Sequence, residues 1–452
     1  MSTSVFRKYL EDFEVPLERL HSFYLYFAGE LKRSLSKNLF HLSDLMCIPT
    51  AITSLPQGYE RGRSLTIVIN ETQVRVSLVV LMSYGDHKEV TEVYELPDKY
   101  TRCSLQKLLT YVAFCLESFL YDITSLPQTE IPLGVIFPLP CYYRSLSGVQ
   151  VIKNFGKFNL RFKPYVDVGL LLEKTIDKLQ TIKIGKISMM NDATNAAFLG
   201  AYNAKNVRIG LHNGDYCNAC YFEALKCVER ADTEYKRKSN MLINIEWGAL
   251  GEKGYLEYFF NKHDIYIDEM SSNRGKQLFN KLVSGKYIIE MWRVVLTDTM
   301  IKGLIFKKNY DKVKIIDAIS YKNALTLQLM GYLERCGMSN IKHLLDKFEA
   351  RQISYDDLCA LKGICSVIIK RAAYIVAVPL SVLVNKIAEA NITIAVDGDV
   401  FREVKSYEKH LRKVMDYFVC PKISYEFVCV DGNTACGPAL LGDYGKWKAT
   451  IR

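Results

Sequence analysis

The sequence lacks several features that would assign a function directly. Neither a G-x-G-x-x-G motif nor a Walker-type loop occurs in its 452 residues, so the two common glycine-rich nucleotide sites are missing. Basic residues are scattered without a long Lys/Arg block, although the formal net charge is +10. That charge suits an anionic ligand such as a nucleotide or sugar phosphate, and we expect no nucleic-acid partner.

Signals for secretion and membrane insertion are also missing. The 13 cysteines have no regular spacing, and the opening segment Met1 to Val15 is charged and has no apolar core. We therefore expect reduced thiols and a cytoplasmic protein. The most apolar run, Ile364 to Ile387, is interrupted by Lys370, Arg371 and Pro379, which predicts a buried helix and no membrane span.

Two β-rich segments of similar order divide the chain. The first predicts three strands, a helix and a fourth strand, at Leu65 to Ile69, Val74 to Leu81, Val90 to Leu96, Leu105 to Leu120 and Ile131 to Phe137. The second predicts strands at Val207 to Leu211, Ala219 to Ala224 and Leu242 to Glu246, helices between Gly275 and Ala388, and then a strand, a helix and a strand at Ile392 to Val396, Val404 to Tyr417 and Tyr425 to Val430. Two β-β-β-α-β units predict an α/β protein with two ribonuclease-H-like lobes around a cleft.

Asp192 is the first candidate for chemistry. It follows the apolar strand Ile187 to Met190 and precedes a helix of small residues, Ala193 to Tyr202. A carboxylate at such a strand end can accept a proton from a substrate hydroxyl. Asp is also a favoured helix N-cap, and the local sequence leaves both roles open.

Other polar residues near the predicted strand ends allow two interpretations each. Glu246 closes a predicted strand, where it either holds a ligand or is an exposed end. His212 could touch a ligand or be a satisfied or exposed histidine. Cys217 and Cys220 form a single C-x-x-C without a second pair or a histidine cluster, so we predict no metal site.

A series of short motifs runs through nearly the whole chain. They are Met46-Cys47-Ile48-Pro49-Thr50, Leu55-Pro56-Gln57-Gly58-Tyr59-Glu60, Ile131-Pro132-Leu133-Gly134, Asn191-Asp192, Asn218-Ala219-Cys220-Tyr221, Ile243-Asn244-Ile245-Glu246-Trp247-Gly248, Gly275-Lys276-Gln277-Leu278-Phe279, Ser284-Gly285-Lys286-Tyr287, Lys370-Arg371-Ala372-Ala373 and Val396-Asp397-Gly398. Each motif is short, but the set in this order and spacing resembles the eukaryotic hexokinase and glucokinase family.

The resemblance implies an actin-like ATPase fold, with residues 57–192 plus 441–452 in a small lobe and 1–56 plus 193–440 in a large lobe. The family transfers the γ-phosphoryl group of ATP to the 6-hydroxyl of a hexose such as glucose, with Mg²⁺, and so feeds glycolysis. Asp192 is then the expected general base. The residues expected to bind the sugar are Asn191, Asn218, Glu246 and Gln277, and those expected near the nucleotide are Thr72, Arg75, Gly214, Asp397, Gly398 and Gly432.

The chain departs from the family where phosphate transfer requires small residues. The first phosphate loop of the family reads Asp-Leu-Gly-Gly-Thr-Asn, and this chain has Val68-Ile69-Asn70-Glu71-Thr72-Gln73. The second loop, Gly-Thr-Gly-Thr in the family, reads Gly214-Asp215-Tyr216-Cys217. Both loops lose glycine and gain an acid, and two unit charges ~4 Å apart repel by a few kcal/mol at an effective dielectric near 20.

The adenosine and sugar regions also differ from the family. Asp399 stands where the family commonly has Ser, and Asn433-Thr434 removes the second Gly of Asp-Gly-Ser-Gly. In the sugar site Pro138 replaces a Ser and Asn280 replaces a second Glu. Phe155-Gly156 replaces a Thr-Lys pair, although Lys157, one residue on, could substitute for that Lys with a small shift.

Three hypotheses follow from this mixture. The first is a divergent hexokinase that works through Asp192. The second is a catalytically impaired or inactive homologue that binds a sugar or metabolite. The third is a protein-interaction module that uses only the two-lobe scaffold, since fold does not imply function.

Overall fold

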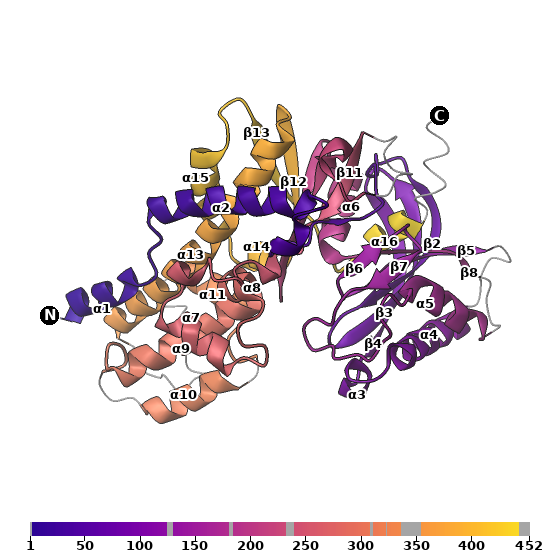
Figure 1. Ribbon diagram of the computed structural model, residues 1–452. Coiled ribbons are helices and arrows are strands. Elements are labelled where there is room, and N and C mark those ends of the chain that lie inside the picture. Colours follow the sequence, from indigo (N-terminus) through magenta and orange to yellow (C-terminus); the bar gives the residue numbers. More distant parts are fainter. Residues whose placement is uncertain are drawn as a thin grey trace.

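The protein, seen here as a computed structural model, is built on two β-sheets (Figure 1). The residues described are 2–123, 130–179, 184–231, 239–307, 311–321, 323–335 and 354–442. One sheet lies with α4 and α5 at one end of the molecule, and a group of helices that includes α9, α10 and α13 lies at the other end (Figure 1).

The first sheet has five strands in the order β4-β3-β2-β5-β8. Its strands are β2 (Arg61–Ile69), β3 (Gln73–Ser83), β4 (Asp86–Glu95), β5 (Ile131–Ile136) and β8 (Ile184–Met190). The same part of the chain also forms the helices α3 (Asp98–Thr101), α4 (Leu105–Tyr121) and α5 (Val168–Asp177). It also forms a two-stranded sheet of β6 (Cys141–Tyr143) and β7 (Val149–Val151). The predicted β-β-β-α-β unit is confirmed, and β8 extends it by one parallel strand beside β5.

The second sheet has six strands in the order β1-β11-β10-β9-β12-β13. They are β1 (Ile48–Pro49), β9 (Val207–Asn213), β10 (Cys217–Ala224), β11 (Asn240–Asn244), β12 (Asn391–Asp397) and β13 (Ser424–Cys429). Without β1, both sheets place their strands in the order third, second, first, fourth, fifth. The duplicated pattern expected from the sequence is therefore a duplicated topology.

Helices from the chain's beginning and second half form the other end of the molecule (Figure 1). They are α1 (Ser2–Glu11), α2 (Leu17–Leu35), α7 (Lys262–Met270), α8 (Leu278–Val283), α9 (Gly285–Ile301), α10 (Lys312–Ser320), α11 (Leu327–Arg335), α13 (Tyr355–Ile387), α14 (Asp399–Glu403) and α15 (Ser406–Phe418). Short 3-10 turns lie at Phe40–Leu42, Leu225–Cys227, Trp247–Ala249 and Glu257–Phe259. The predicted helix from Val404 to Tyr417 begins instead at Ser406, after a break that separates it from α14.

The long apolar helix α13 lies inside the protein core. Of the described helices it alone is long and apolar enough to cross a membrane, and 89% of that apolar window is buried inside the protein. Its Arg371 is buried and donates two hydrogen bonds to Asp264 of α7, at 3.0 and 2.7 Å. The predicted buried helix is confirmed, and its charge is compensated because a buried cation requires a partner.

A third core lies between the two sheets. It contains side chains of α6 (Asp192–Asn203) and α16 (Cys436–Gly442) together with residues from both sheets. The backbone of α16 approaches β5 so closely that a Cβ on Gly134 would lie 1.7 Å from the carbonyl oxygen of Pro438. Only glycine fits that approach. Residues 443–452 lie outside the described residues, so the lobe boundaries, 441–452 included, stay a prediction.

Candidate functional site

The residues expected to act on substrate line two adjoining cavities. The smaller cavity, of about 20 Å³, is lined by Asp192 and the four expected sugar residues Asn191, Asn218, Glu246 and Gln277. The larger, of about 690 Å³, is lined by Asp192 and all six expected nucleotide residues, Thr72, Arg75, Gly214, Asp397, Gly398 and Gly432. Pro138, Phe155, Asp192 and Tyr216 line both cavities and therefore separate one from the other.

The Glu246 carboxylate is the centre of the smaller cavity. Its Oε1 accepts hydrogen bonds from the side-chain amides of Asn244 at 2.8 Å and Asn218 at 3.1 Å, and a longer one from Asn191 at 3.5 Å. Burial raises the pKa of Glu246, although these amides and Lys153 favour its charged form. Glu246 is partly buried in the left-handed region at φ 53°. The expected strand end is therefore wrong by two residues, because β11 stops at Asn244.

Gln277 belongs to the same pocket but bonds to a neighbour. Its Oε1 accepts the amide of Asn280 at 2.7 Å, and Asn280 Oδ1 accepts the backbone N–H of Cys217 at 2.8 Å. Asn280 thus uses its polar atoms to fix the turn that carries Cys217. Pro138 also lines the cavity and has no side-chain donor to offer a sugar hydroxyl.

Asp192 is the first residue of α6, directly after β8. The helix N-cap is Asn191, whose Oδ1 accepts the backbone N–H of Thr194 at 3.0 Å, so the interpretation of Asp192 as the cap is wrong. With its cap role taken by Asn191, the Asp192 side chain is directed into the cleft. Burial raises the pKa of Asp192 despite the neighbouring His212, and the hydroxyl of Tyr216 donates a hydrogen bond to its Oδ2.

His212 forms a charged pair on the nucleotide side of Asp192. Its Nδ1 lies 2.9 Å from Oδ2 of Asp397, and both side chains line the larger cavity. Burial opposes protonation of His212, but the bond to Asp397 and the charge of Asp192 outweigh burial and raise the pKa of His212 to about 9. The pair places a cation beside the expected base at neutral pH.

The first phosphate loop hydrogen-bonds to itself. Asn70 Oδ1 accepts the backbone N–H groups of Thr72 at 2.9 Å and Gln73 at 2.8 Å. Backbone N–H groups in such a turn are the donors that cradle phosphates in many proteins. Glu71 lines the larger cavity, and its carboxylate accepts the backbone N–H of Lys157 at 2.9 Å. This loop therefore presents a carboxylate and few free donors.

Two further amides at the larger cavity, those of Gly214 and Gly432, are also occupied. The Gly214 N–H bonds to the carbonyl oxygen of Tyr216 at 3.1 Å, and the Gly432 N–H bonds to Asp397 Oδ1 at 2.8 Å. Gly398 lies at φ 113°, where a Cβ would meet the carbonyl oxygen of Asn213 at 2.2 Å. Charges lining the larger cavity are mixed, with Arg75, Lys157, His212, Lys286 and Arg402 against Glu71, Asp192, Asp215, Asp397 and Asp399.

The residues at the phosphate loops do not fit the family's magnesium arrangement. Val68 lines the larger cavity in the position where the family has its Asp, and valine offers no oxygen ligand. Among the described residues no group of three or more His, Cys, Asp or Glu side chains could hold a metal ion. Cys217 and Cys220 pack into different core clusters on opposite faces of β10. We therefore assign no step to a metal ion.

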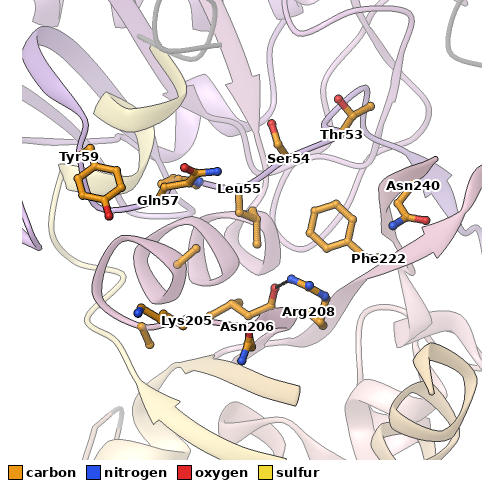
Figure 2. Close-up of a pocket in the computed structure, with 14 residues that line it drawn as sticks. Thr53, Ser54, Leu55, Gln57, Tyr59, Lys205, Asn206, Arg208, Phe222 and Asn240 are labelled. Atoms are coloured by element: carbon orange, nitrogen blue, oxygen red, sulfur yellow. Dashed lines mark hydrogen bonds between the residues drawn. The ribbon is translucent and has the colours of Figure 1, made fainter. Parts of the chain in front are cut away.

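A separate cavity of about 480 Å³ lies away from the cleft (Figure 2). Figure 2 shows Thr53, Leu55 and Gln57 on one side and Asn206 and Arg208 on the other. It shares no lining residue with the two cleft cavities, so the expected site residues all belong to the cleft.

Two contributors to the cleft were missed in the sequence. Asn244 stands only two residues before Glu246, and a carboxylate in a pocket needs hydrogen-bond donors, so this nearby amide could have been proposed as its partner. The hydrogen bonds from the loop backbone to the Asn70 side chain have a weaker signal in the sequence. That signal is only that an Asn side chain often bonds to the backbone two residues onward.

The fold defines the class of protein first. The architecture matches a solved hexokinase of Schistosoma mansoni in complex with glucose, with a TM-score of 0.85 at 22% identity over 98% of this chain and 100% of that one. A second solved hexokinase matches with a TM-score of 0.78 at 21% identity over 97% of this chain and 99% of that one. The chain therefore has the actin-like ATPase fold of sugar kinases.

Sequence comparison identifies the family. Two hexokinase family models match residues 5–202 and 208–442; the chain belongs to the hexokinase family. Similar relatives are hexokinase-2 of Rattus norvegicus, 27% identical over 96% of this chain and 47% of that protein, and hexokinase-1 of Homo sapiens, 26% identical over the same shares. The chain thus spans about half the length of these relatives.

Proposed function

We propose that this chain binds a hexose in the smaller cavity and phosphorylates it slowly at the expense of ATP. The observation that carries the proposal is the Glu246 carboxylate held by Asn191, Asn218 and Asn244 within the pocket that Asp192 lines. Neighbouring amides and carboxylates offer the donors and acceptors that sugar hydroxyls require. Glucose is the first hexose to test, because a similar solved hexokinase was captured with it.

Asp192 is the proposed general base. Its carboxylate accepts the proton of the hexose 6-hydroxyl while that oxygen bonds to the γ-phosphorus of ATP, and the bond from phosphorus to the bridging oxygen of ADP breaks. A pKa raised by burial makes Asp192 a stronger base than an exposed carboxylate. Protonated His212 lines the larger cavity, where negative charge would develop on the transferred phosphoryl group. Electrostatic stabilisation of that charge supplies most of phosphoryl-transfer catalysis.

We expect phosphorylation to be slow because of the loops that would hold the phosphates. Removing one well-placed donor to a developing anion typically costs ~100- to 1,000-fold in rate, and the first loop has its N–H groups bonded to Asn70. Glu71 and Asp215 add negative charge to the same cavity. We therefore expect the chain to bind a hexose and to use ATP weakly.

A coupled assay for hexose 6-phosphate tests this function. We expect slow product formation with glucose and ATP in the wild type, and a further ~100- to 10,000-fold loss in Asp192→Ala, as for removal of a general base. Glu257→Gln, at an exposed carboxylate that lines neither cleft cavity, is the control and is expected to keep the wild-type rate. Product formation unchanged by Asp192→Ala would refute the assignment of the base.

A second candidate function is hexose sensing without turnover. The self-bonded first loop and the Tyr216 hydroxyl on Asp192 favour it, because both leave the sugar pocket residues in place while they weaken transfer. Thermal stabilisation by glucose with no product at millimolar ATP selects this candidate over the first.

A further inference from the structure

Tyr216 is a residue of this chain that occupies the centre of the cleft. It lies in the turn between β9 and β10, at a position where the family has a small residue. Its hydroxyl donates to Asp192 Oδ2, and its ring borders both the smaller and the larger cavity.

The ring of Tyr216 is held by aromatic contacts from two directions. Phe155 meets it edge to face, with ring centroids 5.3 Å apart and planes at 82°, and the His212 ring lies 5.0 Å away. Phe155 follows β7, on the side of the five-stranded sheet, whereas Tyr216 lies in the turn between β9 and β10 of the six-stranded sheet. The contact between the two rings therefore spans the cleft.

The backbone of the turn that carries Tyr216 is anchored by hydrogen bonds. The Gly214 N–H bonds to the Tyr216 carbonyl at 3.1 Å, and the Gly285 N–H bonds to the Gly214 carbonyl at 2.7 Å. The neighbouring Cys217 N–H is bonded to Asn280. A change at this point is therefore a rotation of the Tyr216 side chain, because the turn itself is anchored.

The contact with Asp192 reproduces the bond that a substrate must make. A hydroxyl that donates to the carboxylate of the general base is the arrangement required for proton transfer. With the ring in place the smaller cavity measures about 20 Å³, which is room for about one water molecule. A hexose and the Tyr216 hydroxyl therefore cannot occupy this position together.

We propose that Tyr216 is an internal gate that occupies the place of the acceptor hydroxyl on Asp192 and must turn away, out of contact with Phe155, before a hexose binds. The gate rests on the proposed hexose site and adds a closed state to it. The apparent affinity for hexose is then lowered in proportion to the fraction of molecules with the gate open. The gate also separates the sugar pocket from the nucleotide cavity until the sugar arrives.

Titration calorimetry with glucose tests the gate on Tyr216→Phe and Tyr216→Ala. A hydrogen bond to a charged group is worth roughly 10- to 100-fold in an equilibrium, so Tyr216→Phe is expected to bind glucose about tenfold more tightly or better. Tyr216→Ala, which also removes the ring, is expected to bind at least as tightly as Tyr216→Phe. The control is Tyr165→Phe, whose parent side chain is 79% exposed, and its affinity is expected to equal that of the wild type.

The outcomes separate the gate from the function on which it rests. Glucose affinity that is unchanged or weaker in both folded Tyr216 variants overturns the gate and leaves the hexose site standing. Absence of binding in the wild type with clear binding in Tyr216→Ala supports both. Absence of binding to glucose, mannose and fructose in all variants overturns the proposed function itself. Tyr216→Phe keeps the ring and its packing, so a misfolded Tyr216→Ala does not remove the test.

Discussion

The side chains around Glu246 show how neighbouring amides hold a partly buried carboxylate and favour its charged form against the effect of burial. Asn244 makes the shortest of the three amide contacts, at 2.8 Å. Asn244→Ala removes a hydrogen bond to a charged group, worth about 1.5–3 kcal/mol, so we expect glucose to bind about tenfold more weakly by calorimetry. Asn240→Ala is the control, because this exposed residue of the same strand lines neither cleft cavity. Equal losses in both variants would contradict the role of Asn244.

The His212–Asp397 pair gives the protein a defined pH dependence. The folded-state pKa of His212, about 9, lies above its ordinary value of 6.5. The pair's contribution is therefore complete below about pH 6.5 and is lost as the pH rises through 9, a difference on the order of 3 kcal/mol.

Chemical denaturation between pH 6 and pH 10 measures this contribution. The wild type is expected to lose stability across the upper half of that range, and His212→Gln is expected to start lower and to lose much less. A wild-type curve that is flat between pH 7 and pH 10 would show that the pair is not ionised.

At the scale of elements, the loop from Val68 to Gln73 differs from the family's first phosphate loop in its side chains. It still belongs to the hairpin of β2 and β3. Asn70→Gly with Glu71→Gly frees two backbone donors and removes a carboxylate from the cavity. We expect ATP to bind about tenfold more tightly or better, since one pair of like charges ~4 Å apart costs a few kcal/mol at a dielectric near 20. Nucleotide titration followed by fluorescence or calorimetry measures the change.

The matched control for this loop is Glu257→Gln, which removes one negative charge at an exposed position that lines neither cleft cavity. ATP affinity is expected to stay at the wild-type value in the control. A gain in both variants would point to the overall net charge as the cause and would contradict the local explanation.

Helices and strands could be predicted where burial produces a regular pattern of apolar residues in the sequence. The hydrogen-bond partner of a polar side chain was harder to predict where several partners are available. The strands β2, β3, β5 and β9 to β12 follow from apolar runs, alternation and turn residues, because each has one or both faces in a core. The edge strands β4 and β13 have no fully buried residue and follow from β-rich composition and turn residues. The sequence left open whether Asp192 is a helix cap or a base, since Asn and Asp are both good caps; the structure shows that Asn191 is the cap. The order and spacing of motifs placed the cleft residues correctly near one another, but not the Asn70 and Tyr216 contacts.

At the scale of the molecule, α13 holds the helical end together and its buried arginine can be tested. Arg371 and Asp264 are each only 5% exposed at their side chains and form a two-contact pair. Removing one partner of such a pair costs about 3–5 kcal/mol, so Arg371→Leu is expected to lower the free energy of unfolding by that amount. Arg274→Ala, whose side chain is 71% exposed, is expected to cost at most about 1 kcal/mol.

The shared strand order of the two sheets is the feature of the whole molecule that could be predicted most clearly from the sequence. Their cleft gathers every expected site residue into two adjoining cavities, although those residues lie between Thr72 and Gly432 in the chain. The separation of the two cavities could not be predicted from the sequence. It depends on a contact between the ring of Phe155, which follows β7, and the ring of Tyr216, in the turn between β9 and β10.

Glucose binding to the wild type and to Glu246→Ala tests the central claim most directly. Calorimetry without nucleotide is expected to show saturable binding by the wild type, strengthened by substitution of Tyr216, and no measurable binding by Glu246→Ala with its fold confirmed by circular dichroism. Binding of equal strength in Glu246→Ala, or no binding of any hexose to the wild type and to the Tyr216 variants, would contradict the claim that this cleft is a hexose site.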